Sequence, residues 1–217
     1  MAEPDDSFFE IDPFKLAESL GQSLYFQDGR EKEAIPIVDD ALATLRNARG
    51  EINQDFAFAI ALKASLADQF GNFDEAEADY ARAAEIYRAI RGDDHQSVVI
   101  ELANVGSIAM HKKDYVRAEG FFRDVIRRYG RILPADNENV GIARIKLGRC
   151  LLREKRYQDA EKESLAGYQI VAKQASPSID FLRGARSDLI AIYLALGESD
   201  KAEKFRAEAV AEKASRK

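Results

Sequence analysis

The sequence predicts an all-α fold made of five repeats, each a pair of helices joined by a turn. The first observation is an alanine that recurs every 42 residues through the 217-residue chain, at Ala34, Ala76, Ala118, Ala160 and Ala202. The second is that glutamate follows four of these alanines and an apolar residue stands ten positions before all five. The third is that the chain has only five prolines and long stretches without glycine, which favours helix. A fixed repeat of this length is typical of helical solenoids.

Each repeat divides into two helical patterns around a break. In the second repeat, Gly71-Asn72 interrupts the apolar periodicity, and Asp74 can cap the helix that follows. The same reading predicts helix pairs at 15–28 with 31–47, 55–70 with 74–91, 97–112 with 116–131, 139–154 with 158–174, and 181–196 with 200–214. The repeats themselves would span about 15–56, 57–98, 99–140, 141–182 and 183–217.

Two columns of the repeat have a direct physical reason. The alanine column predicts a close crossing of the paired helices, where only a small side chain fits. Five positions before each alanine stand Gly29, Gly71, Lys113, Lys155 and Gly197. Glycine at this position indicates a turn residue with a positive φ. The two lysines indicate that this turn does not strictly require glycine.

Three segments resemble the tetratricopeptide repeat. Residues 71–77, Gly-Asn-Phe-Asp-Glu-Ala-Glu, resemble the turn and the start of the second helix of that repeat. Its usual period is 34 residues. The longer period here, with Gly92-Asp93-Asp94-His95 before a helix and Leu102-Ala103-Asn104-Val105 inside one, resembles the kinesin-light-chain-like subclass. The resemblance implies one right-handed superhelical domain over residues 15–217. The tryptophan, leucine and glycine signature of the family is eroded in this chain.

The same resemblance implies a concave groove that is lined by the first helix of each pair. In the first three repeats, the positions that face the groove carry a serine together with an amide or imidazole side chain. In the fourth repeat they carry three cationic side chains. We expect asparagine to bind a peptide backbone, serine to allow close approach, and the cations to pair with carboxylates. The candidate peptide-binding residues are Ser65, Gln69, Asn104, Ser107, His111, Lys146, Arg149 and Arg153.

The distribution of charge supports an acidic partner. Residues 1–111 hold 9 basic and 22 acidic residues, for a net charge of -13, whereas residues 112–156 hold 13 basic and 6 acidic, for +7. The net charge of -6 therefore conceals a basic centre. Four arginines of a second helix add to this centre, and we interpret them as solvated helix-face charges. They are Arg123, Arg127, Arg128 and Arg131.

The first fourteen residues lie before the repeats. They carry five acidic residues, no basic residue, and Phe8, Phe9 and Phe14. One interpretation is a flexible arm or a cap on the first repeat. The other is an arm that docks into the basic groove of its own chain or of a neighbouring one.

The sequence lacks the patterns of common catalytic and cofactor sites. It has no phosphate-binding loop, no dinucleotide fingerprint and no His-Glu-x-x-His. Cys150 stands in an otherwise aliphatic column, so we expect a buried, inert thiol. We expect His95 to cap or pack in a loop, and His111 to face the groove as a solvated polar residue. The sequence thus predicts no catalytic residue, no cofactor and no metal.

The leading function is therefore a non-catalytic scaffold or adaptor that holds an extended, acidic peptide. The alternative is self-assembly into an oligomer, in which the acidic half of one chain pairs with the basic centre of another. The negative net charge argues against nucleic acid, and no apolar run is long enough to span a membrane. The acidic start of the chain is unlike a secretory signal, and a single cysteine suits the cytoplasm.

Overall fold

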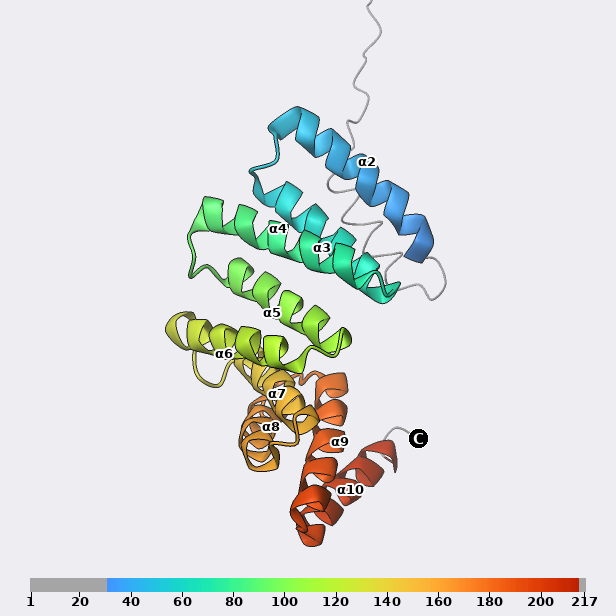
Figure 1. Ribbon diagram of the computed structural model, residues 1–217, viewed down its shortest axis with the longest axis vertical. Helices are drawn as coiled ribbons and strands as arrows, with labels where there is room; N and C mark the ends of the chain where they lie inside the picture. The colour runs from blue at the N-terminus through green and yellow to red at the C-terminus, as the bar shows by residue number, and fades with distance from the viewer. Residues whose placement is uncertain (1–30, 215–217) are drawn as a thin grey trace, which may run out of the picture. The chain divides into compact units, whose positions relative to one another are not determined.

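The structure of the protein, a computed structural model, describes residues 31–214. All regular secondary structure in that range is α-helical, as the sequence predicts (Figure 1). The described residues belong to two compact units, one ending at Asp93 and the other beginning at Asp94. The expected helix at 15–28 and the acidic segment 1–14 lie outside the described residues, and a single continuous domain over 15–217 stays a prediction.

The described residues of the first unit form three helices: α2 (Glu31–Arg49), α3 (Gln54–Gln69) and α4 (Phe73–Arg91). α3 packs against both of the others. Asn53 begins α3 by accepting a hydrogen bond from the Phe56 amide at 2.9 Å, which satisfies one of the free donors at the helix start. Ala34 and Val38 of α2 are buried against Leu66 of α3. This apolar contact joins the first pair of the repeat series to the second.

The second unit contains six helices, each of which packs against the next. They are α5 (Gln96–His111), α6 (Tyr115–Ile132), α7 (Glu138–Arg153), α8 (Tyr157–Ala172), α9 (Ile179–Leu196) and α10 (Ser199–Ala214). α7 also contacts α5 and α9, the first helices of the neighbouring pairs. The first helices of three consecutive repeats therefore form one continuous layer.

The predicted helix ends agree with the observed ones to within two residues throughout the described range. α3, α5 and α7 begin at equally spaced positions, Gln54, Gln96 and Glu138. α9 begins one residue earlier than this spacing requires, at Ile179, and it is two residues longer than α7. The last pair therefore departs slightly from the regular arrangement of the pairs before it.

All five members of the alanine column are completely buried, as expected of small side chains between closely packed helices. The helix predicted to pair with that of Ala34 lies outside the described residues. In the second unit, Ala118 and Ala160 belong to one cluster with Phe122 and Leu147. A larger side chain at these positions would force the helix pairs apart.

The turns between paired helices share one geometry. The central residue has a positive φ in each turn, +76° at Gly71, +63° at Lys113, +62° at Lys155 and +77° at Gly197. The next residue donates its backbone N–H to the carbonyl five residues earlier, at 2.8 to 2.9 Å in all four turns. This is the Schellman arrangement that ends many helices. The expectation that lysine can replace glycine in this turn is confirmed.

α7 and α8 are in close contact at positions where both helices carry small residues. A Cβ added to Gly148 would lie 2.1 Å from Ser164 Oγ and 2.8 Å from the Ser164 backbone nitrogen. A Cβ added to Gly167 would lie 2.5 Å from the carbonyl oxygen of Gly141. The two helices thus meet almost backbone to backbone, which fixes the position of α7 relative to α8.

Candidate peptide-binding groove

The eight predicted binding residues are divided between the two units. Ser65 and Gln69 belong to α3, where Ser65 is half-buried and Gln69 is exposed. The other six lie on α5 and α7 of the second unit. His111 is exposed at the C-terminal end of α5. Because the chain divides into two compact units, the geometry of the candidate groove is described for the second unit alone.

A groove of about 180 Å³ lies between α5 and α7. Two of the predicted residues, Asn104 and Lys146, line it, together with Ile100, Tyr129, Asn139 and Ile142. Small-molecule sites usually occupy about 300–1,000 Å³. The groove is therefore smaller than a typical small-molecule site, and its volume is enough for a single side chain.

Sequence reasoning missed Ile100, Tyr129 and Asn139 as groove residues. Ile100 is an aliphatic side chain that remains 37% exposed, and Ile142 follows it by one 42-residue step. The sequence signal that could have identified this position was an apolar residue that recurs in two repeats on an outward-facing part of the helix. Tyr129 comes from α6, a second helix, so the expectation that only first helices line the groove could not identify it.

Lys146 is held in a defined position by three other helices. Its Nζ donates to Ser107 Oγ of α5 at 2.7 Å, and Ser107 Oγ donates in turn to the Ala103 carbonyl at 2.9 Å. The ammonium also lies 5.9 Å from the ring centre of Phe122 on α6 and 5.7 Å from that of Phe181 on α9. Such cation–π contacts restrain the side chain. The groove thus has a positively charged group at a fixed place.

Asn104 contacts a buried carboxylate. Its Nδ2 donates to Glu101 Oε2 at 3.0 Å, and Glu101 is only 6% exposed. Burial raises the pKa of Glu101 to about 7, although the hydrogen bond from Asn104 acts in the opposite direction. Burial and then the charge of Glu101 raise the pKa of Tyr129 to about 12. One amide donor of Asn104 is therefore used within the protein.

Arg149 is part of the packing between α7 and α9. Its Nε donates to Asp188 Oδ2 at 2.7 Å, and Asp188 is 8% exposed. A Cβ on Gly184 of α9 would lie 2.5 Å from the Arg149 guanidinium. Burial raises the pKa of Asp188, whereas the charge of Arg149 lowers it. Replacing Arg149 would leave a buried carboxylate without its partner, so this residue is a poor choice for a binding test.

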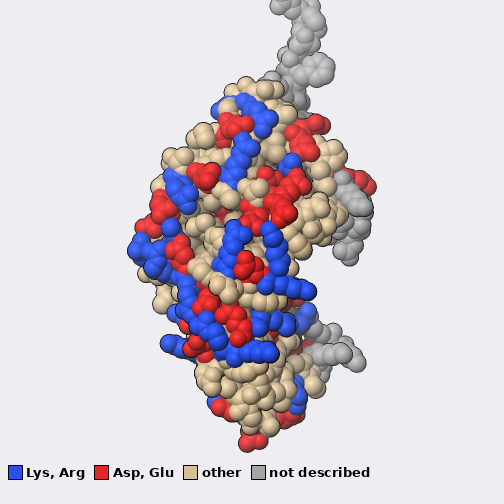
Figure 2. All heavy atoms as spheres, in the orientation of Figure 1, with Lys and Arg blue, Asp and Glu red and all other residues tan. Residues whose placement is uncertain are grey.

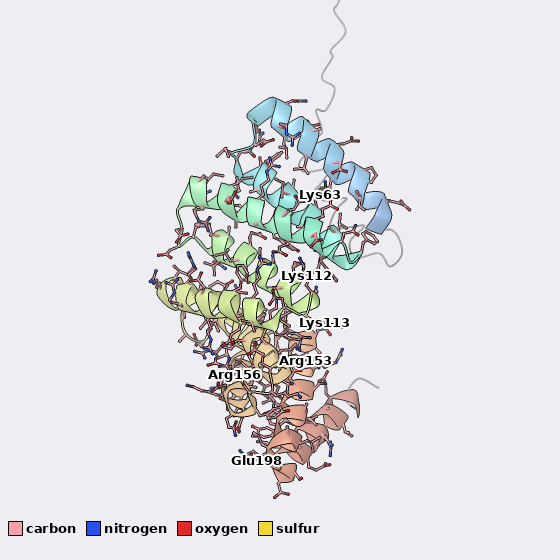
Figure 3. All side chains as sticks on the ribbon, viewed as in Figure 1. Lys63, Lys112, Lys113, Arg153, Arg156 and Glu198 are labelled. Atoms are coloured by element: carbon pink, nitrogen blue, oxygen red, sulfur yellow. The ribbon has the colours of Figure 1, made fainter. Side chains whose placement is uncertain are left out.

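Arg153 remains exposed at the C-terminal end of α7 (Figure 3). Arg153 is exposed whereas Arg149 pairs with Asp188, although the sequence predicts both arginines on one helix face. Of the three predicted cations, Lys146 lies in the groove, Arg149 pairs with α9, and Arg153 faces solvent.

The arginines of α6 form ion pairs on the surface of the unit. Arg123 pairs with Glu119, Arg127 and Arg128 with Asp124, and Arg131 with Asp94. Figure 2 shows basic and acidic side chains interspersed over α6 and α8. Arg123, Arg127 and Arg131 are exposed, in agreement with their interpretation as solvated helix-face charges, and exposed pairs of this kind contribute little to stability. Arg128 departs from that interpretation, because its side chain is only 13% exposed where it pairs with Asp124.

The two remaining candidates for chemistry have structural roles. Cys150 is completely buried, and burial raises the pKa of its thiol to about 12, so the thiolate is suppressed at neutral pH. His95 precedes α5, and its Nδ1 accepts a hydrogen bond from the Ser97 amide at 3.2 Å. Both outcomes match the sequence predictions.

Within the described part of the chain, no group of three histidine, cysteine, aspartate or glutamate residues has the arrangement of a metal site. No helix there combines the length and the apolar character needed to cross a membrane.

Comparisons with known proteins agree on the fold. The family model of the tetratricopeptide repeat matches residues 64–97. The crystal structure of BtubC (BKLC) from P. vanneervenii is similar, with a TM-score of 0.80 and 20% identity over 93% of this chain and 80% of that one. A putative kinesin light chain from Podosopora anserina with TPR-like repeats gives a TM-score of 0.71 and 16% identity over 94% and 95% of the two chains.

A third similar structure is the apo form of RapI, with a TM-score of 0.77 and 16% identity over 94% of this chain and 72% of that one. No curated protein sequence matches this chain. At these identities the structural likeness establishes the fold and nothing finer. The family match to one repeat, the common turn geometry and the layered helix pairs lead to the same conclusion: residues 64–97 match the tetratricopeptide repeat, and the described residues have the all-α solenoid fold seen in kinesin-light-chain-like repeats.

Proposed function

We propose that the protein is a non-catalytic interaction module that holds an extended peptide of a partner protein in the groove between α5 and α7. The observation that carries this proposal is the groove itself, which places Asn104, Asn139 and Lys146 around a space that fits one side chain. Repeat solenoids commonly use such concave surfaces for binding. The tetratricopeptide-repeat fold supports a role in protein interaction in general. That the ligand is an extended peptide is our inference.

The charge of the groove favours a peptide with an acidic residue. Lys146 is the charged side chain that lines it. Its fixed ammonium suits a carboxylate. Ile100 and Ile142 suit an aliphatic side chain next to that carboxylate. We therefore propose an extended segment with adjacent aliphatic and acidic residues as the ligand, bound in the cytoplasm.

The test compares two double variants in affinity capture from the native lysate, with quantitative mass spectrometry. Asn139→Ala/Lys146→Gln removes two polar groups of the groove, and the glutamine can still contact Ser107. Gln158→Ala/Lys162→Gln makes the matched change at two exposed positions of α8. We expect the groove variant to lose the specific partners of the wild type by about tenfold, which corresponds to one or two lost polar contacts.

The control variant should retain those partners, and both variants should melt at the wild-type temperature. If the groove variant captured the same proteins as the wild type, the proposed groove would be wrong. Partners lost equally by both variants would indicate non-specific attraction to charge.

A further inference from the structure

One buried position of the repeat carries a carboxyl group in α5 and an alanine elsewhere in the described chain. Glu101 is 6% exposed, and it stands at 42-residue steps from Ala59, Ala143 and Ala185, which are 0 to 3% exposed. Alanine is therefore sufficient for packing at this position. Burial of an ionisable carboxyl group costs free energy. A residue that departs from its repeat at such a cost points to a function.

Glu101 is connected to the groove through two of the residues that line it. Its Oε2 accepts the hydrogen bond from Asn104 Nδ2 at 3.0 Å. Its charge also acts on Tyr129 of α6, whose pKa it raises in addition to the effect of burial. Asn104 and Tyr129 both line the groove. A change in the charge of Glu101 is therefore felt at the place where the peptide of the proposed function would bind.

Glu101 titrates near neutral pH, whereas Tyr129 does not. α5 packs against α6 and α7. From α6, the titratable group near Glu101 is Tyr129, whose pKa of about 12 keeps it neutral at physiological pH. From α7, the charged group at the groove is Lys146, whose ammonium donates to Ser107 Oγ. Burial raises the pKa of Glu101 to about 7 against the hydrogen bond from Asn104.

The protonation state of Glu101 decides which atoms of the Asn104 amide are available to a ligand. An ionised carboxylate only accepts, so it engages one N–H of Asn104 Nδ2. A protonated carboxyl group can donate to Asn104 Oδ1, which leaves both N–H groups free for a ligand. A ligand carboxylate needs donors, and it would then find them in the groove that also contains the ammonium of Lys146. The ionised state withdraws a donor and adds a negative charge, which repels such a ligand.

We propose that protonation of Glu101 regulates the groove: the neutral carboxyl group favours binding of an acidic peptide, and the ionised carboxylate disfavours it. This regulation rests on the proposed function, because it concerns the same groove and the same class of ligand. Binding is then coupled to proton uptake, so the affinity is full at low pH and falls as the pH rises through the titration of Glu101. If the bound peptide shifts this titration by about one pH unit, the Kd rises about fivefold between pH 6 and pH 8.

The first test measures the Kd of a synthetic peptide for the full-length protein at pH 6 and pH 8 by fluorescence anisotropy. The probe consists of isoleucine-glutamate-serine repeats with a tetramethylrhodamine label, and its glutamates stay ionised in this range. For the wild type we expect a Kd about fivefold higher at pH 8. Glu101→Gln and Glu101→Ala, which are neutral at every pH, should bind equally at both pH values. Glu203→Gln, at an exposed position of α10, should follow the wild type.

The groove variant Asn139→Ala/Lys146→Gln separates the two proposals. If the wild type did not bind the peptide at pH 6, or if the groove variant bound it equally well, the proposed function and its regulation would both be wrong. If the groove variant lost binding but the wild type and Glu101→Gln responded equally to pH, the regulation alone would be wrong. Tighter binding by the wild type at pH 8 would also contradict it. Circular dichroism at both pH values confirms that each variant is folded.

The second test requires no ligand. In proton–nitrogen correlation spectra of the full-length protein, the side-chain amide of Asn104 should shift with pH, with a midpoint of about 7. This shift should be absent in Glu101→Gln, and the side-chain amide of Asn72, an exposed residue, serves as the reference. An Asn104 amide that is insensitive to pH in the wild type would overturn the regulation and leave the groove itself unaffected.

Discussion

Glu101 shows how a single residue can make the stability of the protein depend on pH. Its side chain is buried with Asn104 as its hydrogen-bond donor, and burial raises its pKa from 4.5 to about 7. The folded state therefore binds a proton more tightly than the unfolded state. Between pH 4.5 and 7 this difference makes the protein less stable as the pH rises, by up to about 3 kcal/mol above pH 7.

Urea unfolding of the wild type and of Glu101→Gln at pH 5 and pH 8 tests this behaviour. We expect the variant to gain stability relative to the wild type at pH 8 and to show little difference at pH 5. Glu203→Gln, at an exposed position of α10, serves as the control and should follow the wild type. Parallel pH profiles of the wild type and Glu101→Gln would show that Glu101 titrates normally.

At the scale of the helices, small residues decide how closely two elements can pack. Gly148 of α7 lies against Ser164 of α8, where an added Cβ would overlap both side chain and backbone. Gly120 of α6 has no neighbouring atom within 4 Å of such a Cβ. The two glycines are both helical but differ in their surroundings, so the same substitution has opposite consequences.

Gly148→Ala should lower the free energy of unfolding by about 2 kcal/mol, because α8 must move away from α7. Gly120→Ala should raise it by about 0.5–1 kcal/mol, because alanine favours the helix and meets no neighbour. Urea denaturation of both variants checks the two signs. A free energy of unfolding that is unchanged or raised in Gly148→Ala would mean that α7 and α8 do not meet backbone to backbone.

At the scale of the whole molecule, the charge is divided along the sequence. The first 111 residues carry a net charge of -13 and the stretch 112–156 carries +7, the pattern on which the self-assembly alternative rests. Within the second unit, however, three arginines of this stretch pair with acidic residues that lie outside it: Arg131 with Asp94, Arg144 with Glu163 and Arg149 with Asp188. These internal pairs reduce the charge available to another copy of the chain.

We therefore expect the mass of the protein measured by light scattering to be the same at low and at high salt. The attraction between opposite charges on two chains weakens as the Debye length falls, from about 30 Å at 0.01 M salt to about 3 Å at 1 M. A mass that increases at low salt would support self-assembly in place of a monomeric adaptor.

Much of the fold could be predicted because it depends on local patterns. The positions of Ala118 and Ala160 at helix crossings, and the positive φ of Lys113 and Lys155, follow from a column of the repeat and the residues next to it. The site was predicted less completely. Asn104 and Lys146 line the same groove, and whether they bind a peptide stays a prediction.

The sequence by itself determined the helix pairs, their turns and the small residues between them, because side-chain size, helical periodicity and turn conformation act over a few neighbouring residues. The tertiary structure alone decided that Arg149 pairs with Asp188, that Lys146 lies between Phe122 and Phe181, and that Tyr129 enters the groove. These contacts join side chains from different repeats. Which of them meet depends on how the repeats pack in space, and that packing is not contained in the periodicity of any one helix.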